Sequence, residues 1–244
     1  MFDTVILLLI AFFGAFTQTV SGFGMGLIMM PGFASILGLE TARPLVTLLG
    51  STAQAVVMIR NRRSLTFGSL GVLTVMGLGG VWIGNRVIEL GILPEAILKL
   101  GLAAIIIGYA LYALLSPTMP HLKTDRWAWP VGLMSGVLSG TYNTGGPPVV
   151  IYADARRWTP EMMRSNLSGF FLTKGLMLMW VHFRSGNFTP QVMNLYYLGV
   201  PVLIVGMLIG FSLYGKINDV RFRQIVLILL LAMGVNILRG VVFG

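Results

Sequence analysis

Long apolar stretches alternate with short polar connections along the whole chain. Runs without a charged residue cover residues 4–39, 64–85, 100–120, 127–153 and 185–215. Each run can cross the hydrocarbon core of a membrane, which takes about 20 residues of helix. Strands of a transmembrane barrel would alternate apolar and polar residues, whereas these runs are apolar on every face. The pattern predicts an all-α integral membrane protein.

Glycine-rich and polar interruptions divide these runs into shorter apolar pieces. The pieces cover residues 4–20, 24–38, 44–59, 66–85 and 96–116 in the first half of the chain, and 128–142, 147–153, 165–182, 189–214 and 222–238 in the second half. Some of them are too short to span a membrane alone, so we expect about 8 to 10 membrane segments.

The two halves of the chain resemble each other in sequence. Moving residues 40–67 forward by 121 positions places Glu40 on Glu161, Arg43 on Arg164, Thr52 on Thr173, Met58 on Met179, Arg63 on Arg184, Ser64 on Ser185 and Phe67 on Phe188. Further along, an offset of 126 places Gly80 on Gly206, Gly84 on Gly210 and Gly108 on Gly234. We interpret residues 1–116 and 127–244 as two repeats joined by a linker over residues 117–126.

Basic residues in the connections predict how the two repeats are related. Each repeat begins with an apolar segment that a glycine-rich break divides in two. Suppose that this first segment returns to its own side of the membrane and is followed by three complete crossings. The basic loops at residues 60–63, 123–126, 156–164 and 216–223 then all face one compartment, as the positive-inside rule favours. Three crossings are an odd number, so the second repeat would be inverted relative to the first. A single crossing by each broken element is the alternative.

Each repeat has a glycine-rich break inside its first apolar segment. The first break contains Gly22, Gly24 and Gly26, with the polar residues Gln18 and Ser21 beside it. Backbone polar groups freed by a break inside a membrane are tolerated only where protein buries them or where they line a polar cavity. Paired broken helices near the midplane are typical of the binding sites of secondary transporters.

The second break has a different composition. Tyr142, Asn143 and Thr144 supply polar side chains, and Gly145 and Gly146 supply bare backbone. The two prolines that follow suit the first turn of a new helix. The start of such a helix favours anions through its free N–H groups and its dipole. We therefore expect the two breaks to form one small anion site, although isolated glycines elsewhere in the chain are better explained by close helix packing.

Lys174 lies near the centre of an otherwise uncharged run, residues 165–181. A lysine at that depth normally faces a bundle interior or a water-filled cavity and marks a pathway. We expect it to attract an anionic substrate. A structural role, with backbone carbonyls or a hydroxyl such as that of Thr173 as partner, is the alternative. Its repeat equivalent is Ala53, so the two repeats would contribute unequally to the site.

Two acid–base pairs recur at the same place in each repeat. Glu40 precedes Arg43 by three residues, and Glu161 precedes Arg164 by three residues, which places each pair on one helical face. Ion pairs that fix the geometry of helix ends are the simpler interpretation. Gates on opposite faces of the membrane are the alternative.

Composition excludes several classes of protein. The chain has 56% hydrophobic and only 10% charged residues, and it contains no cysteine and two histidines, so no metal site or cysteine nucleophile is expected. The net charge of +9 comes from the short loops and reflects membrane topology instead of nucleic-acid binding. No catalytic triad, cofactor motif or phosphate-binding loop is present, so we expect neither an enzyme nor a cofactor.

The two breaks resemble those of the TauE/SafE family of sulfite exporters. The matching stretches are Val20-Ser21-Gly22-Phe23-Gly24-Met25-Gly26-Leu27-Ile28-Met29-Met30-Pro31 and Leu138-Ser139-Gly140-Thr141-Tyr142-Asn143-Thr144-Gly145-Gly146-Pro147-Pro148. The resemblance implies a duplicated transporter of the inner (plasma) membrane that exports sulfite, organosulfonates or other small anions. Family members more often have three consecutive glycines where this chain has Phe-Gly-Met-Gly.

These observations lead to a functional hypothesis. We expect a secondary transporter that exports a small anion by alternating access, with the lipid bilayer and the substrate as its partners. A passive anion channel, a permease for small carboxylates and a non-transporting membrane scaffold are the alternatives. The coupling ion and the formation of a homo-oligomer are left open.

Overall fold

The computed structural model describes residues 2–62, 65, 68–115, 121–214, 216 and 219–242. Arg63, Ser64 and Phe67 of the repeat match, and residues 117–120 of the linker, lie outside this part of the chain. The described residues form α-helices and one short 3-10 helix. These are α1 (Phe2–Ser21), α2 (Met25–Asn61), α3 (Gly68–Glu89), α4 (Glu95–Leu115), η2 (Asp125–Trp127), α5 (Ala128–Tyr142), α6 (Gly146–Ala155), α7 (Pro160–Arg184), α8 (Pro190–Leu213) and α9 (Asp219–Val242).

The prediction of an all-α membrane protein is confirmed. In the described part of the chain, helices long and apolar enough to cross a membrane cover Asp3–Ser21, Met25–Asn61, Leu70–Glu89, Glu95–Leu115 and Pro190–Leu213. The shorter stretch Val226–Val242 is also apolar. Large apolar side chains such as Val75, Trp82 and Leu208 are exposed, as expected for a surface that faces lipid.

Helix α2 consists of two arms that meet at Gly38. This glycine has φ 77° and ψ 164°, a left-handed conformation that side chains disfavour, so the predicted pieces 24–38 and 44–59 become consecutive arms at residues 25–37 and 39–61. The first arm runs back along α1, because Gly32 lies against Ile10 while Gly14 lies against Met29. The chain therefore returns from the first break toward the end at which α1 began.

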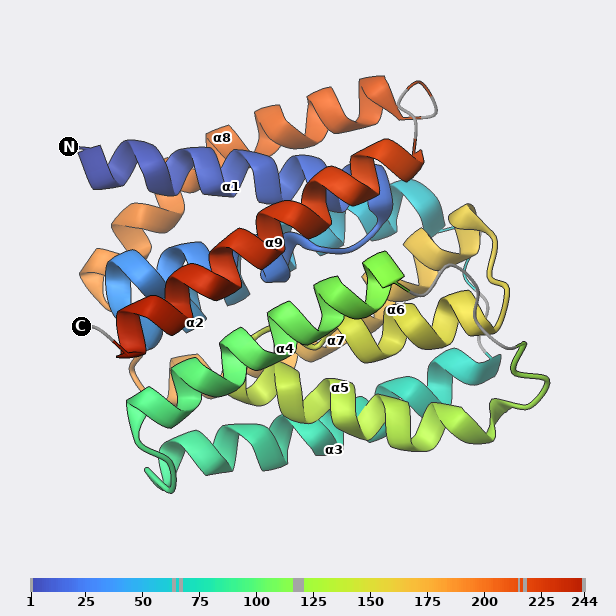
Figure 1. Ribbon diagram of the computed structural model, residues 1–244, viewed down its shortest axis with the longest axis horizontal. Helices are drawn as coiled ribbons and strands as arrows, with labels where there is room; N and C mark the ends of the chain where they lie inside the picture. Colours follow the sequence, from blue (N-terminus) through green and yellow to red (C-terminus); the bar gives the residue numbers. More distant parts are fainter. Residues whose placement is uncertain are drawn as a thin grey trace.

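The second break makes a similar hairpin. Helix α6 ends beside the segment that precedes α5, where the Arg156 guanidinium pairs with the Asp125 carboxylate at 2.7 Å and the Leu122 N–H donates to the Ala155 carbonyl at 2.9 Å. In Figure 1, α2, α4 and α8 end at the right of the bundle, and α3, α5, α7 and α9 begin there, whereas both chain termini lie at the left. The described basic loops therefore gather at one end of the bundle.

The most extensive helix contacts join elements from different halves of the chain. Helix α3 packs on α5, α1 on α8, α2 on α7 and α4 on α9. The first of these contacts depends on glycine, because a Cβ at Gly80, Gly84, Gly136 or Gly140 would meet the backbone of the facing helix. Small residues allow helix backbones to approach closely in membranes. The packing interpretation of Gly80 and Gly84 is confirmed, whereas a Cβ on Gly71 would meet open space.

We predict that Gly136→Ala destabilises the protein. The new methyl would meet the carbonyl of Gly77 and lie 2.8 Å from Cα of Gly80, so α3 and α5 must separate. Overpacking of this kind costs about 1–3 kcal/mol. The matched control is Gly79→Ala, where the methyl meets nothing within 4 Å. Thermal unfolding of the purified variants measures both changes, and equal midpoints would contradict the predicted contact.

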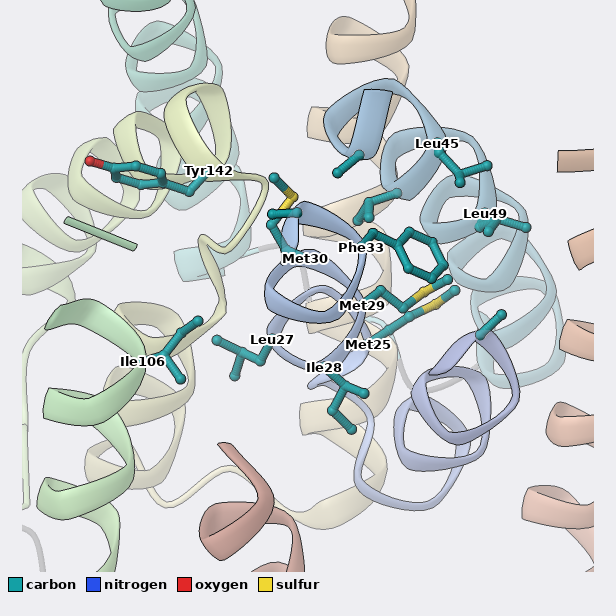
Figure 2. Packing of buried hydrophobic residues seen from close by; sticks show 14 of the residues in the cluster. Met25, Leu27, Ile28, Met29, Met30, Phe33, Leu45, Leu49, Ile106 and Tyr142 are labelled. Atoms are coloured by element: carbon teal, nitrogen blue, oxygen red, sulfur yellow. The ribbon is translucent and has the colours of Figure 1, made fainter. Parts of the chain in front are cut away.

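The first arm of α2 is enclosed by protein on every side. Met25, Leu27, Ile28, Met29, Met30 and Phe33 are all buried and point in different directions around this arm (Figure 2). A helix that is apolar on all faces is stable only when it is fully surrounded. The arm thus holds its own first turn, and the break before it, at a fixed place inside the bundle.

Candidate functional site

The two chain breaks open onto one internal cavity of about 80 Å³. The lining residues come from both breaks, from the middle of the second arm of α2 and from the middle of α7. They are Gln18, Gly24, Met25, Gly26, Leu27, Val46, Thr47, Gly50, Ser51, Gln54, Ser139, Asn143, Thr144, Gly145, Gly146, Phe171, Lys174, Gly175 and Leu178. We call this space the inner cavity.

At the first break, left-handed glycines turn the chain between α1 and α2. Gly22 has φ 83° and Gly24 has φ 102°, conformations that favour glycine. The buried Gln18 amide supports the turn, because its Nε2 donates to the Gly22 carbonyl at 2.8 Å and to Oε1 of Gln54 at 3.1 Å. Gly24 then begins α2 without any side-chain cap. The start of α2 is therefore open to the inner cavity.

At the second break, Asn143 performs the corresponding turn with φ 58°. Its Nδ2 donates to the Arg43 carbonyl at 2.9 Å and to the Thr47 hydroxyl at 2.7 Å, which ties the break to α2. Helix α6 begins at Gly146 with prolines in its first turn and without a side-chain cap. The starts of two helices thus border the same cavity, an arrangement that favours an anion.

Lys174 reaches the second break from α7. Its side chain is 2% exposed, and its Nζ donates to the Ser139 hydroxyl at 2.7 Å and to the Ser135 hydroxyl at 2.8 Å. The same nitrogen lies 4.1 Å from the centre of the Phe170 ring. Every one of these partners is neutral, and Lys174 is the only charged side chain among the described residues that line the inner cavity.

Two hydroxyl groups at the inner cavity have no hydrogen-bond partner within the described protein. They belong to Thr144, which is 1% exposed, and to Ser51, which is 8% exposed. A buried hydroxyl without a partner costs free energy of the order of 1–3 kcal/mol. Their position on the cavity wall means that a bound ion or water can supply the missing bonds. The cavity is large enough for a small ion, since a single water needs only about 10–15 Å³.

Most of the predicted binding residues line the inner cavity. Those that do are Gln18, Gly24, Gly26, Asn143, Thr144, Gly145, Gly146 and Lys174. Three others do not. Ser21 donates to the carbonyls of Thr17 and Phe23, Gly22 packs against Arg164, and Tyr142 packs against Gly101 of α4. Figure 2 shows the Tyr142 side chain directed away from the first arm of α2.

The predicted ion pairs do not form. Nη2 of Arg43 donates to the Gly140 carbonyl at 2.5 Å and lies 3.4 Å from Oδ1 of Asn85, so this guanidinium joins α2 to α5 and α3. The Arg164 guanidinium lies over the Tyr214 ring, 3.4 Å from its centre. Glu40 and Glu161 stay near the surface, because burial of the arginines in helix contacts separates each acid from its base. Ion pairs in the described residues join Arg86 to Glu89, Lys99 to Glu95 and Arg156 to Asp125.

Several site residues were not predicted from the sequence. These are Thr47, Ser51, Gln54, Ser135 and Ser139, all polar positions within apolar helices. Ser135 and Ser139 are four residues apart and so lie on one face of α5, a spacing that indicates a polar helix face in the sequence. The structural alternative for Lys174 expected backbone carbonyls or a hydroxyl as partners, and such groups are present: the hydroxyls of Ser135 and Ser139 and, at 3.4 Å, the Ser135 carbonyl. The hydroxyl named as an example, that of Thr173, donates instead to the Gly169 carbonyl at 2.9 Å.

Comparisons with known proteins identify the family of this chain. The family model described as Sulfite exporter TauE/SafE matches residues 7–237. A curated relative from Cupriavidus necator, described as "Probable sulfite/organosulfonate exporter TauE", is 25% identical over 230 residues, which cover 92% of this chain and 90% of the relative. No solved structure matches the chain significantly. A transporter family implies a non-enzymatic function. This chain, a multi-pass membrane protein with a lysine-containing cavity between two chain breaks, belongs to the sulfite exporter TauE/SafE family of membrane exporters.

Proposed function

We propose that this protein is a secondary transporter of the plasma membrane that exports a small anion, with sulfite as the first candidate. One observation supports this most directly: a buried lysine with only neutral partners shares one cavity with the starts of two helices. An anion in the cavity would balance the charge of Lys174 and accept hydrogen bonds from Ser51 and Thr144. No described acidic side chain lines the cavity to compete with it.

The size of the inner cavity favours a compact anion. Its volume of about 80 Å³ suits an inorganic oxyanion or a sulfonate head group better than a sulfonate with a bulky tail. The Cupriavidus necator relative is described as an exporter of sulfite or organosulfonates, and sulfite is the smaller of these substrates. Small carboxylates would satisfy the same donors and form the second class to test.

We further propose that residues 1–116 and 127–244 are inverted repeats joined by the linker 117–126. The helix contacts support this. Exchanging the two halves turns the contact of α1 with α8 into that of α5 with α3, and it leaves the contacts of α2 with α7 and of α4 with α9 unchanged. Each break also packs on the arginine of the other half, Gly22 on Arg164 and Asn143 on Arg43. Alternating access would then proceed by exchange of conformations between the halves, with the breaks as re-entrant hairpins around a fixed site.

Transport against a gradient distinguishes this proposal from a passive channel. Purified protein in proteoliposomes should accumulate radiolabelled sulfite above the external concentration when a proton or sodium gradient is imposed. A channel would only equilibrate sulfite, and a scaffold would give no flux above that of empty liposomes. Liposomes with the Lys174→Met variant serve as the matched control. Equilibration without accumulation under every imposed gradient would refute the secondary-transport mechanism.

A further inference from the structure

A second and larger cavity adjoins the inner cavity. Its volume is about 330 Å³, and it shares Gly24 and Leu27 with the lining of the inner cavity. Residues from the end of α1, from α4, α6, α7 and α9 and from the connections that follow α6 and α8 surround it, including Trp158, Arg164 and Tyr214. We call this space the vestibule. Its lining includes the start of α7 and the residue after α8, which lie at the end of the bundle that contains the described basic loops.

Arg164 is an incompletely satisfied cation in the vestibule wall. The residue is 7% exposed, and among the described residues it forms one hydrogen bond, from Nε to the Pro160 carbonyl at a long 3.4 Å. The Tyr214 ring covers one face of the guanidinium at 3.4 Å, which leaves the N–H edge for a ligand. Neither terminal nitrogen has a partner in the described part of the chain. A guanidinium stacked in this way is well suited to bind a carboxylate or sulfonate with two hydrogen bonds.

The rest of the vestibule is largely apolar. Val226, Leu227 and Leu230 of α9 form one wall, and Phe23 and Trp158 contribute aromatic surface. Ligand sites of this size typically combine an apolar lining with a few convergent polar groups. The vestibule therefore offers an anchor for a charged head and a separate surface for an apolar tail. The inner cavity is too small to hold such a tail beside the head group.

We propose that the vestibule is a second anion site, specific for sulfonates or carboxylates that have an apolar or aromatic tail. Such anions bind with the head on Arg164 and the tail against α9, and they stop there because the inner cavity is too small for the tail. They occupy the route that a small substrate uses and so inhibit its transport. Only this inhibition rests on the proposed transport function. Binding to Arg164 does not, because it is independent of Lys174.

Asp154 is the acidic residue among the described residues that line the vestibule. Its carboxylate forms no ion pair with Arg164, so it is a repulsive charge for an anionic ligand. Asp154→Asn should strengthen binding of a tailed anion by about two- to fivefold. This change leaves the inner cavity untouched, because Asp154 does not line it.

Isothermal titration with benzenesulfonate and with sulfite tests the proposal on purified protein in nanodiscs. Arg164→Gln should weaken benzenesulfonate binding at least tenfold and sulfite binding less than threefold. Lys174→Met should weaken sulfite binding at least tenfold and benzenesulfonate binding less than threefold. Arg60→Gln is the matched control, because Arg60 also stacks on an aromatic ring, Phe211, at 4.2 Å and lines neither cavity. Val226→Phe, which fills the vestibule without removing charge, should also weaken benzenesulfonate binding selectively.

The outcomes separate the two sites. Absence of benzenesulfonate binding to the unaltered protein, or equal affinities of the Arg164→Gln and Arg60→Gln variants, would overturn the vestibule proposal. Loss of benzenesulfonate binding in Lys174→Met would also overturn it, since the ligand would then occupy the inner cavity. Unchanged sulfite affinity in Lys174→Met would overturn the proposed function alone. If Arg164→Gln does not fold, Arg164→Lys and Val226→Phe decide the question.

Discussion

Lys174→Met will weaken sulfite binding by roughly ten- to a hundredfold and reduce transport accordingly. A hydrogen bond to a charged group contributes about 1.5–3 kcal/mol, and about 1.4 kcal/mol corresponds to a factor of ten in affinity. Lys174 supplies the one charged group among the described residues of the inner cavity. Titration of sulfite into purified protein measures the affinity, and proteoliposome flux measures transport.

Stability of the Lys174→Met variant should remain the same or increase. A buried charge is costly to desolvate, and methionine replaces it with an apolar chain of similar length. Ser135 and Ser139 keep hydrogen bonds to backbone carbonyls, since Ser135 donates to Gly145 and Ser139 donates to Ser135 at 2.9 Å. The matched control is Lys123→Met in an exposed loop, which should leave binding unchanged. A folded Lys174→Met protein with the sulfite affinity of the unaltered protein would exclude Lys174 from the site.

Gly145→Ala will reduce transport at least tenfold although it adds a single methyl group. That methyl would clash with the Ser139 hydroxyl and the Ser135 carbonyl and would lie 2.9 Å from Nζ of Lys174. The backbone at Gly145 has φ −73°, which alanine adopts freely, so the effect comes from lost space. We expect destabilisation of about 1–3 kcal/mol and displacement of the Lys174 ammonium group, with at least a tenfold loss of flux.

The neighbouring glycine offers a close control for this variant. A methyl at Gly146 would meet only Cζ of Phe171, at 4.0 Å, which is ordinary contact. Gly146→Ala should therefore keep its thermal midpoint and at least half of its flux. The two variants have the same composition and lie in the same break. Equal flux in both would show that the packing around Gly145 does not shape the transport site.

Much of the fold could be predicted from the pattern of apolar residues. The apolar pieces correspond to helices because a membrane segment must satisfy its backbone hydrogen bonds internally. The two breaks were also predictable, since glycine clusters and paired prolines interrupt helices for local steric reasons. The junction at Gly38 was less evident, because one isolated glycine in an apolar run is compatible with either a turn or close packing.

The site was predictable where one residue was exceptional in its surroundings. Lys174 stood out as a charge within an apolar run, and the breaks identified most of the backbone that lines the inner cavity. Arg43 and Arg164 were assigned to the wrong partners, because spacing by three residues describes a single helix and ignores its neighbours. Their guanidinium groups instead bind or stack on residues 97 and 50 positions away, Gly140 and Tyr214.

The sequence by itself determined that this chain is a helical membrane protein with two broken segments and one buried lysine, because hydropathy and backbone sterics are local properties. Only the tertiary structure decided that Lys174 meets Ser135 and Ser139, that Ser51 and Thr144 remain without partners, and that Tyr142 turns away from the cavity. Which side chains share a space depends on how helices from the two halves pack against each other, and close contacts between glycine backbones set that packing.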